Sequence, residues 1–348
     1  MAARPVAVIT GYLGSGKTTL LNRLLREPGM ADAAVIINEF GEIAIDHLLV
    51  ESAIENTLVL QNGCVCCTVR GDLVDTIVDL EEKCRRGAIP DFSRVLIETT
   101  GLADPGPIIH TLATDAAVAP LCRLHGVIAT VDAVNGLAQL DRFTEPARQA
   151  ALADVILITK TDIADAGHTA DLRSRLAALN PGAQVREVSF GRIGADELFG
   201  HGHYHAPDDA MAVRRWLGAS AAGATPAGHD HGPQGNTIGA ASLTLDAPIE
   251  WDALSRWLQS VLSLRGADIL RLKGLVNVAS MSQPVVVQAV HHLLHPPTML
   301  ARWPDSDHRT RIVVIAEGIP AGALQASLEA MATASGAPSD APSLGRSG

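Results

Sequence analysis

The chain has 348 residues, of which 47% are hydrophobic and 19% charged, so it can bury the cores of about two domains and is not intrinsically disordered as a whole. Its 27 Lys and Arg against 38 Asp and Glu give a net charge of −11, which argues against a nucleic acid or an anionic membrane as the main partner. No apolar run approaches the ~18 residues of a membrane helix, and the first residues lack the features of a signal peptide.

Residues 1–207 alternate short apolar runs with amphipathic helical stretches. Several runs are rich in β-branched residues and show no polar alternation, which is typical of strands buried on both faces of a parallel sheet. These runs are residues 6–10, 34–38, 95–98, 126–131 and 155–158, with a shorter one at 58–60. Between them, leucine and isoleucine recur at helical spacing over residues 73–80 and 172–179. The alternation predicts a doubly wound α/β domain with a mostly parallel sheet.

The rest of the chain has a different pattern. Residues 218–236 are dominated by Gly, Ala, Pro and Ser, so we expect a flexible linker that contains histidines over residues 208–236. Residues 237–331 are expected to form a smaller C-terminal α+β domain with largely antiparallel strands, and residues 332–348 a disordered tail. In that domain, strands are expected near residues 241–245, 272–278, 285–290 and 312–316, and helices over 254–261 and 324–331.

A glycine-rich loop follows the first predicted strand. Residues 11–18 read GYLGSGKT and match G-x-x-x-x-G-K-[ST], in which backbone N–H groups and the start of a helix surround phosphate oxygens, as in the P-loop NTPases. Lys17 is expected to reach the β- and γ-phosphates, and the Thr18 hydroxyl to bind Mg²⁺. A chance glycine-rich turn is the alternative, but the strand before the loop and the amphipathic helix after it argue against that. The predicted nucleotide contacts of this P-loop are Gly11, Gly14, Ser15, Gly16, Lys17, Thr18 and Thr19.

A second motif, ETTG, ends the predicted strand at residues 95–98. Glu98 is expected to hold Mg²⁺ or its water, and Gly101 to offer its N–H to the γ-phosphate. Most P-loop GTPases carry Asp at the position of Glu98. Together with Lys17, these two residues are the predicted catalytic groups.

A third motif, TKTD, follows the predicted strand at residues 155–158. Lys160 and Asp162 fit the N-K-x-D pattern, in which the carboxylate accepts two hydrogen bonds from guanine that adenine cannot donate. Thr159 stands where Asn is commoner, which weakens the motif taken alone. Because the motif follows a buried strand, GTP is expected in preference to ATP.

The five cysteines are an odd number, and three of them lie within four positions, so they do not form a disulfide framework and we expect a cytoplasmic protein with reduced thiols. Cys64, Cys66 and Cys67 form a C-x-C-C cluster whose thiolates suit Zn²⁺, Co²⁺ or Cu⁺. Three sulfurs leave one tetrahedral position open, which suits metal delivery better than structural support. A buried or redox-active group of thiols is the alternative. Cys84 and Cys122 are expected to be small buried apolar side chains.

Histidines are clustered directly before the expected linker and within it. The members of this cluster are His201, His203, His205, His229 and His231. Loose capture of a metal and a merely solvated spacer both fit such a composition, and the sequence leaves these two interpretations open. The three histidines of QAVHHLLH at residues 288–295 are expected to share a helical face and to have a structural role.

Taken together and in this order, GYLGSGKT, NEFGEIAID (residues 38–46), NGCVCC, ETTG, TVDA (130–133) and TKTD closely resemble the CobW-type GTPases. That family belongs with the GTPases that help insert nickel into urease and hydrogenase. The resemblance covers nearly the whole chain, including a C-terminal domain with RLKGLV and QAVHHLLH. It implies a metal-dependent GTPase that carries Zn²⁺ or Co²⁺ to a client metalloprotein or a cobalamin-pathway enzyme. It also implies metal ligation by the C-x-C-C thiols, a Walker-B role for Glu98 and a nucleotide-responsive switch segment that contains Glu39, a further candidate ligand.

Hydrolysis of GTP to GDP and phosphate is expected to rely on positioning and charge, without a covalent nucleophile. NEFGEIAID and NGCVCC both lie between the P-loop and ETTG, so a γ-phosphate that orders the switch segment is expected to assemble the thiol site, and hydrolysis to loosen it. A GTP-binding metal buffer or sensor with little turnover is the main rival, and a P-loop kinase would leave the cysteines unexplained. A homodimer remains an open alternative to a monomer.

Overall fold

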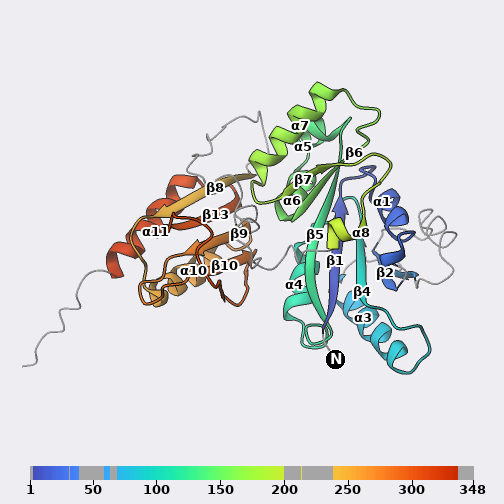
Figure 1. Cartoon of the computed structure of the whole chain (residues 1–348), viewed down its shortest axis with the longest axis horizontal. Coiled ribbons are helices and arrows are strands. Elements are labelled where there is room, and N and C mark those ends of the chain that lie inside the picture. Colours follow the sequence, from blue (N-terminus) through green and yellow to red (C-terminus); the bar gives the residue numbers. More distant parts are fainter. Residues whose placement is uncertain are drawn as a thin grey trace, which may run out of the picture.

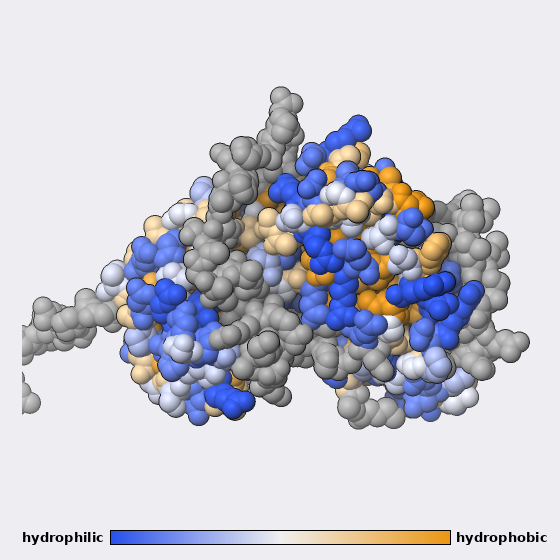
Figure 2. Space-filling model, turned by 45° about the horizontal axis from the view of Figure 1, so that its top comes forward, coloured by the Kyte–Doolittle hydropathy of each residue, from blue (hydrophilic) through white to orange (hydrophobic). Residues whose placement is uncertain are grey.

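The computed structural model describes residues 3–30, 32–38, 59–62, 69–199, 213 and 238–335, which form two sheets with their helices (Figure 1). The first sheet belongs to an N-terminal domain and the second to a C-terminal domain. On the face drawn in Figure 2, hydrophobic residues gather over the first domain, whereas the second is mainly hydrophilic. Within the described residues, no helix has the length and apolar character needed to cross a membrane.

Seven parallel strands form the first sheet in the order β3-β2-β4-β1-β5-β6-β7. They are β1 (Arg4–Gly11), β2 (Ala33–Asn38), β3 (Val59–Asn62), β4 (Arg94–Thr99), β5 (Cys122–Asp132), β6 (Val155–Thr159) and β7 (Gln184–Glu187). The central strands are buried almost throughout, because helices cover the sheet from both sides. The predicted parallel sheet is confirmed, and each predicted strand overlaps an observed one.

Helices cover both faces because successive residues of a strand point to opposite sides of the sheet. Val8 of β1 belongs to one hydrophobic cluster with Leu80 and Leu176, whereas its neighbour Ile9 belongs to the other with Leu20. The first face carries α3 (Val69–Arg85), α4 (Gly106–Thr114), α5 (Gly136–Arg142), α6 (Thr144–Leu152) and α7 (Ala166–Leu179). The second face carries α1 (Lys17–Leu24), the 3-10 turn η1 (Pro28–Met30) and α8 (Ala195–Phe199).

The C-terminal domain is an antiparallel sheet with two helices on one face. Its strand order is β11-β10-β9-β13-β8, with β12 paired to β10. The strands are β8 (Ile238–Leu245), β9 (Ile269–Val276), β10 (Val285–Val290), β11 (Leu293–Leu294), β12 (Thr298–Met299) and β13 (Thr310–Glu317). Helices α10 (Trp251–Arg265) and α11 (Ala321–Ser335) pack on one face, where the Trp257 indole N–H donates to Ser327 Oγ over 2.7 Å. The predicted α+β domain is confirmed, and α11 continues into the segment expected as a tail.

The other face of this sheet packs against the first domain, because residues of β8, β9, β10 and β13 belong to the cluster that includes α6 and α7. Arg271 of β9 forms an ion pair with Asp154 and donates to Leu152 O over 2.5 Å. Lys273 Nζ lies 3.9 Å from the same carboxylate and donates to Gly182 O over 3.3 Å. The charged side chains of this group are at most 4% exposed. The two domains therefore share a hydrophobic core and a buried ionic link.

The histidines of QAVHHLLH lie in a β-hairpin, so the prediction of a shared helical face is wrong. β10 ends at Val290, His291 and His292 form the turn, and β11 follows. His291 has a φ of +49°, and His292 Nδ1 lies 2.8 Å from Leu262 O of α10. The β-branched residues of β10 pair with β9 along the whole strand, and this pairing overrides the helical spacing of the histidines.

Candidate functional site

The carboxyl ends of neighbouring strands bring the predicted nucleotide motifs to one edge of the first sheet. β1 runs into the P-loop, β4 carries Glu98 near its end, β5 ends in TVDA and β6 ends at Thr159. In the register of the sheet, Ile9 lies opposite Glu98, and Gly11 lies opposite Thr130. Since the strands are parallel, their carboxyl ends meet at the same edge, where α/β folds bind ligands.

The P-loop has a backbone shape that requires glycine and is fixed by β5. Gly11 has a φ of +143°, and a Cβ there would lie 2.3 Å from Thr130 Oγ1, so no other residue fits. Gly16 has a φ of +96° directly before α1. The Ser15 hydroxyl lies 2.7 Å from the Thr130 hydroxyl. Helix α1 has no side-chain cap at its N-terminus, and the first N–H groups of a helix, which have no carbonyl partner within the helix, suit a phosphate.

Lys17 lies across this loop and is 8% exposed. Its Nζ donates to Gly11 O over 2.9 Å and to Tyr12 O over 3.3 Å. The ammonium group is therefore held among the backbone atoms of the P-loop. A phosphate bound there would receive a charge-assisted hydrogen bond from it.

Thr18 and Glu98 meet beside the P-loop. Thr18 Oγ1 donates to Glu98 Oε1 over 2.8 Å, and Glu98 is 2% exposed. A hydroxyl and a carboxylate side by side supply the oxygen ligands that Mg²⁺ prefers. The residues present therefore fit a magnesium ion at the position that the sequence predicts.

The loop after β4 rests directly on the P-loop. A Cβ at Gly101 would lie 2.8 Å from the backbone nitrogen of Leu13 and 2.9 Å from its Cα, so only glycine allows this approach. Gly101 is buried. The ETTG motif and the P-loop are therefore in backbone contact. This contact is needed if Gly101 is to reach the γ-phosphate of a nucleotide in the P-loop.

Thr159 joins TKTD to the P-loop. Its hydroxyl donates to Ser15 O over 2.7 Å and lies 3.3 Å from Val131 O, and the residue is 6% exposed. The shorter side chain in place of the commoner Asn therefore still makes a hydrogen bond between the predicted base-binding motif and the predicted phosphate-binding loop. The departure from N-K-x-D leaves the two motifs connected.

Lys160 is anchored by Asp132, a residue that the sequence analysis does not single out. Lys160 has a φ of +58°, and its Nζ donates to Asp132 Oδ2 over 2.8 Å. Burial disfavours the Asp132 carboxylate, but hydrogen bonds from Lys160 and Asn135 outweigh it, and the pKa of Asp132 lies below its usual value. Asp162 lies two residues further on and is exposed. TVDA follows a buried apolar run, but no local pattern in the sequence pairs Asp132 with Lys160.

The loop after β7 also belongs to this edge, and the sequence analysis misses it. Ser189 Oγ lies 2.9 Å from Thr161 Oγ1 of TKTD. Phe190 has a φ of +53° and is 64% exposed. The only sequence feature that marks this loop is the two glycines of SFGRIG, which follow a short, half-buried strand. A cavity of about 290 Å³ beside α1 is lined by Thr19, Asn22, Arg23, Arg26 and Phe190.

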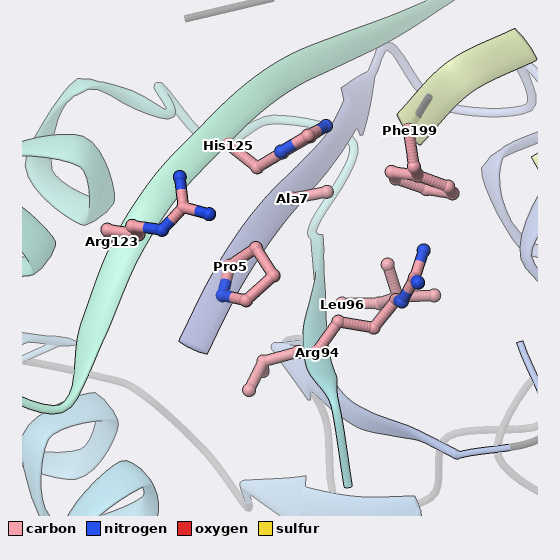
Figure 3. A pocket seen from close by; sticks show the side chains of 8 residues that line it. Pro5, Ala7, Arg94, Leu96, Arg123, His125 and Phe199 are labelled. Carbon is pink, nitrogen blue, oxygen red and sulfur yellow. The ribbon is translucent and has the colours of Figure 1, made fainter. Parts of the chain in front are cut away.

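A second cavity, of about 210 Å³, lies at the opposite, amino-terminal end of the central strands (Figure 3). Residues two apart on a strand point to the same face of the sheet, so β1, β4 and β5 each contribute a pair of side chains to the cavity. The aromatic ring of Phe199 in α8 forms a further part of the wall. The cavity is lined by Pro5, Ala7, Arg94, Val95, Leu96, Arg123, His125 and Phe199. It is separate from the nucleotide motifs, which lie at the other end of the same strands.

The predicted thiol site, the switch glutamate and the clustered histidines lie outside the described residues. They are Glu39, Cys64, Cys66, Cys67, His201, His203, His205, His229 and His231. In the part of the chain that the structure describes, no group of three His, Cys, Asp or Glu could hold a metal ion.

The two remaining cysteines differ from one another. Cys122 is buried, as predicted, and burial raises the pKa of its thiol to about 12. Cys84 is only half-buried, and its Sγ donates to Asp91 Oδ1 over 3.2 Å, so the prediction of a buried apolar side chain is wrong there.

Two families of known domains match the chain. Residues 5–187 match the family described as CobW/HypB/UreG, nucleotide-binding domain, and residues 238–332 match the cobalamin synthesis protein cobW C-terminal domain.

Full-length relatives match as well. The zinc chaperone YjiA of Escherichia coli is 34% identical over 318 residues, which are 91% of this chain and 95% of the relative. The zinc chaperone CobW of Pseudomonas aeruginosa is 30% identical over 359 residues, covering 93% of this chain and 90% of the relative. The crystal structure of Zn(II)-bound YjiA GTPase from E. coli has a TM-score of 0.74 at 28% identity and covers 95% of this chain and 99% of that one. The chain therefore belongs to the CobW/HypB/UreG family and carries the CobW-type C-terminal domain.

Proposed function

We propose that the chain is a GTPase that hydrolyses GTP to GDP and phosphate and acts as a metallochaperone, carrying Zn²⁺ or Co²⁺ to a client metalloprotein or a cobalamin-pathway enzyme. The observation that carries the nucleotide half is the edge at which the Lys17 contacts, the Thr18–Glu98 pair and the Thr159 hydrogen bond meet. The names of the relatives, zinc chaperone and zinc-regulated GTPase metalloprotein activator, support both halves.

Hydrolysis at this edge depends on position and charge. Thr18 and Glu98 would hold Mg²⁺, which would supply positive charge to the β- and γ-phosphate oxygens. Lys17 donates to the same oxygens, and the N–H of Gly101, which lies against Leu13 of the P-loop, donates to the γ-phosphate. These donors stabilise the charge that develops during transfer of the phosphoryl group to water, and no covalent nucleophile is required.

Guanine is recognised by Asp162. The carboxylate accepts hydrogen bonds from guanine N1–H and the 2-amino group, which adenine lacks. Two neighbouring groups border the base site. Lys160 is held by Asp132, and the loop that carries Phe190 contacts TKTD through Ser189. Because Asp162 is exposed, the bound base itself must exclude water for this selectivity to be strong.

The metal cargo is held by Cys64, Cys66 and Cys67, with Glu39 as a further candidate ligand. Thiolates favour Zn²⁺ and Co²⁺ over Mg²⁺, so the cargo site and the magnesium site do not compete. A Zn(II)-bound triple mutant of the YjiA GTPase, in which one glutamate and two cysteines are replaced by alanine, has a TM-score of 0.73 to this chain. Since that mutant still carries zinc, tests on this chain must follow the tightest site and not total bound zinc.

The sheet supports a link between the two sites. The segments that contain Glu39 and the cysteines directly follow β2 and β3; β2 pairs with β4 in the sheet, and β3 pairs with the other edge of β2. At the carboxyl edge, Asn38 lies opposite both Thr99 of β4 and Asn62 of β3. The chain therefore leaves both strands at the edge where Glu98 lies, and a γ-phosphate bound there is placed to order both segments. This is the basis for metal affinity that depends on the nucleotide.

Turnover separates this proposal from a GTP-binding metal buffer or sensor. We expect phosphate release from GTP by the zinc-loaded chain, and faster release when a zinc chelator takes the place of the client and accepts the metal. Lys17→Ala should abolish release in both conditions. Tight GTP binding with no release, with or without the chelator, would instead identify a buffer or sensor. Analytical ultracentrifugation of the same samples shows whether the chain is a monomer or a homodimer.

A further inference from the structure

The loop that connects β4 to α4, residues 100–106, is held by α6. Gln149 of α6 is 1% exposed, and its Nε2 donates to Gly101 O over 3.1 Å and to Ala103 O over 3.0 Å. Gly101 in turn contacts the backbone of Leu13 in the P-loop. A single buried amide therefore fixes the peptide groups on which the predicted γ-phosphate contact depends.

The neighbouring residue of α6, Arg148, connects the same loop to the C-terminal domain. Its NH1 donates to Asp104 Oδ2 over 3.4 Å, and its NH2 donates to Glu317 Oε2 over 2.6 Å. Asp104 also accepts a hydrogen bond from the N–H of Gly106 at the start of α4. Glu317 is the last residue of β13. The guanidinium group thus joins the end of the nucleotide loop to a strand of the second domain.

The β10–β11 turn of the C-terminal domain also packs against this loop. A Cβ at Gly106 would lie 2.5 Å from His291 Nε2, so the imidazole is packed directly against the start of α4. Three buried polar atoms around this loop have no hydrogen-bond partner among the described residues: Thr100 Oγ1, Gln149 Oε1 and His291 Nε2. Buried polar groups usually have a hydrogen-bond partner, so these three atoms are open to hydrogen bonds from water or from groups of the loop that shift position.

We propose that Gln149 and Arg148 are positioning residues for hydrolysis: Gln149 holds the loop after ETTG against the P-loop, and Arg148 couples that loop to the C-terminal domain. The proposal rests on the proposed GTPase function. Gln149 sets the orientation of Gly101, and Arg148 couples Asp104 to Glu317. Nucleotide state and the contact between the domains therefore depend on one another, by the reciprocity of linked equilibria.

The kinetic test uses the full chain with Gln149→Leu, Arg148→Ala and Glu317→Gln. Leu has a similar volume to Gln but cannot donate to Gly101 O, so kcat should fall about tenfold while KM changes less than twofold, because two positioning hydrogen bonds are lost and the P-loop is untouched. Glu317→Gln should lower kcat in the wild-type background and have no further effect in Arg148→Ala. Arg173→Ala is the matched control, since Arg173 forms an exposed ion pair with Glu187 in the same domain, and it should leave kcat unchanged.

Hydrogen–deuterium exchange gives a readout that does not depend on hydrolysis. A non-hydrolysable GTP analogue, compared with GDP, should change the exchange of β13 in the wild type and in Arg173→Ala but not in Arg148→Ala. Thermal unfolding of each variant shows that it is folded. An unchanged kcat in Gln149→Leu, or an exchange difference that survives Arg148→Ala, would overturn the proposal. If the wild type binds GTP without hydrolysing it, the proposed function fails, and the exchange measurement still decides whether the domains are coupled.

A second inference rests on the cavity of Figure 3 and is independent of the first. Among the residues that the structure describes, Arg94 and Arg123 form no ion pair and no acidic side chain lines the cavity, in a chain of net charge −11. Arg94 lies with its guanidinium carbon 5.7 Å from the centre of the Phe199 ring. Guanidinium groups recognise carboxylates and phosphates, and the ring offers a flat apolar wall. We infer that this cavity binds a small anion with a flat apolar body.

The test for this cavity uses benzoate as the probe, on the full chain loaded with GDP so that the P-loop is occupied. Saturation-transfer NMR should show benzoate binding to the wild type, displacement of benzoate by inorganic phosphate, and loss of the signal in Arg123→Ala. Arg85→Ala is the matched control because Arg85 is also exposed but lies at the end of α3, and it should keep the signal. Equal signals in the two variants would overturn the inference.

Discussion

Lys17 shows how one side chain serves both the shape and the chemistry of the site. Its ammonium group donates to two carbonyls of its own loop, so it stabilises the P-loop before any phosphate is bound. The phosphates of a bound nucleotide would accept hydrogen bonds from the same ammonium group. Replacing this residue therefore removes a charge from the site and also loosens the loop around it.

Lys17→Ala is expected to abolish GTP hydrolysis and to weaken GTP binding by at least tenfold, because a charge-assisted hydrogen bond contributes about 1.5–3 kcal/mol. The fold should be retained, since the strands that flank the loop do not depend on this side chain. Phosphate release and calorimetric GTP binding measure the two effects. Wild-type turnover in a folded variant would exclude catalysis at this loop.

Asp162→Asn is expected to weaken GTP binding and to reduce the preference for GTP over ATP, because an amide cannot accept both guanine N–H groups. Since Asp162 is exposed, its replacement should not change the free energy of unfolding. Competition of ATP against a fluorescent GTP analogue measures the preference. A variant that keeps wild-type affinity and selectivity for GTP would show that TKTD does not read the base.

The residues that could be predicted from the sequence are those whose role is local. The P-loop glycines and Lys17 follow a strand and start a helix within eight positions, so their geometry is determined by nearby residues. Asp132 and Gln149 could not be predicted in this way. Asp132 acts by anchoring Lys160, and Gln149 by holding Gly101 from a separate helix, and neither contact has a pattern in the sequence.

At the scale of single elements, β1, β2, β4 and β6 could be predicted because their residues are almost all buried and mostly apolar, whereas the short, half-buried β7 could not. The turn between β10 and β11 could not. There the histidine spacing suggests one helical face, but Val285–Val290 pairs with β9 and forces a hairpin. Tertiary pairing overrode a local pattern, and it placed His291 in the interface between the domains.

The placement of His291 predicts a pH dependence of stability. Burial lowers the pKa of His291, and Arg148 and His292 lower it further, although Asp104 opposes them. A folded-state pKa below the ordinary value of about 6.5 means that the unfolded chain takes up the proton first as the pH falls. His291 therefore reduces the stability of the folded protein below about pH 6.5 and has no such effect above it.

His291→Gln should remove this contribution, so that the free energy of unfolding falls less steeply between pH 7 and pH 5 than in the wild type. Urea unfolding at a series of pH values gives the two slopes. Parallel slopes would show that His291 does not titrate differently in the folded and unfolded states. His308→Gln serves as the control, because His308 lies in a surface segment of the same domain.

At the scale of the whole molecule, the two domains are joined by a buried contact that is both apolar and ionic. Their hydrophobic clusters are continuous, and Arg271, Asp154 and Lys273 are buried in the contact between them. Asp154 also accepts a hydrogen bond from the N–H of Val127 in β5. Two cations share one carboxylate, and burial together with Arg271 lowers the pKa of Lys273 well below its usual value.

Lys273→Met and Asp154→Asn should therefore have opposite effects on stability. Met fills a similar volume without a buried charge, so the free energy of unfolding should stay the same or rise by up to ~4 kcal/mol. Asp154→Asn leaves Arg271 buried without its counter-charge and should lower stability by about 3–5 kcal/mol. Denaturant unfolding measures both. A loss of stability in Lys273→Met equal to that in Asp154→Asn would mean that Lys273 is as strongly paired as Arg271.

The loops that surround the nucleotide edge also carry large exposed apolar side chains, including Leu13, Leu102 and Ile163, which are 54%, 53% and 70% exposed. They follow β1, β4 and β6, so apolar surface and nucleotide contacts belong to the same loops. A client or a second copy of the chain that binds there would meet a surface whose shape depends on the nucleotide. The coupling of nucleotide to metal is therefore the property on which the whole account depends.

The most direct test of that coupling is to titrate Zn²⁺, and separately Co²⁺, against the full chain held with a non-hydrolysable GTP analogue and then with GDP. If the γ-phosphate orders the segments that follow β2 and β3, the metal should bind more tightly with the analogue, by a coupling of ~1–3 kcal/mol, and should raise the affinity for the analogue by the same factor. Cys66→Ser should abolish the difference while leaving metal-free binding of the analogue unchanged, because a hydroxyl is a poor ligand for these ions. Equal metal affinities in the two nucleotide states would contradict the account and leave a passive metal buffer.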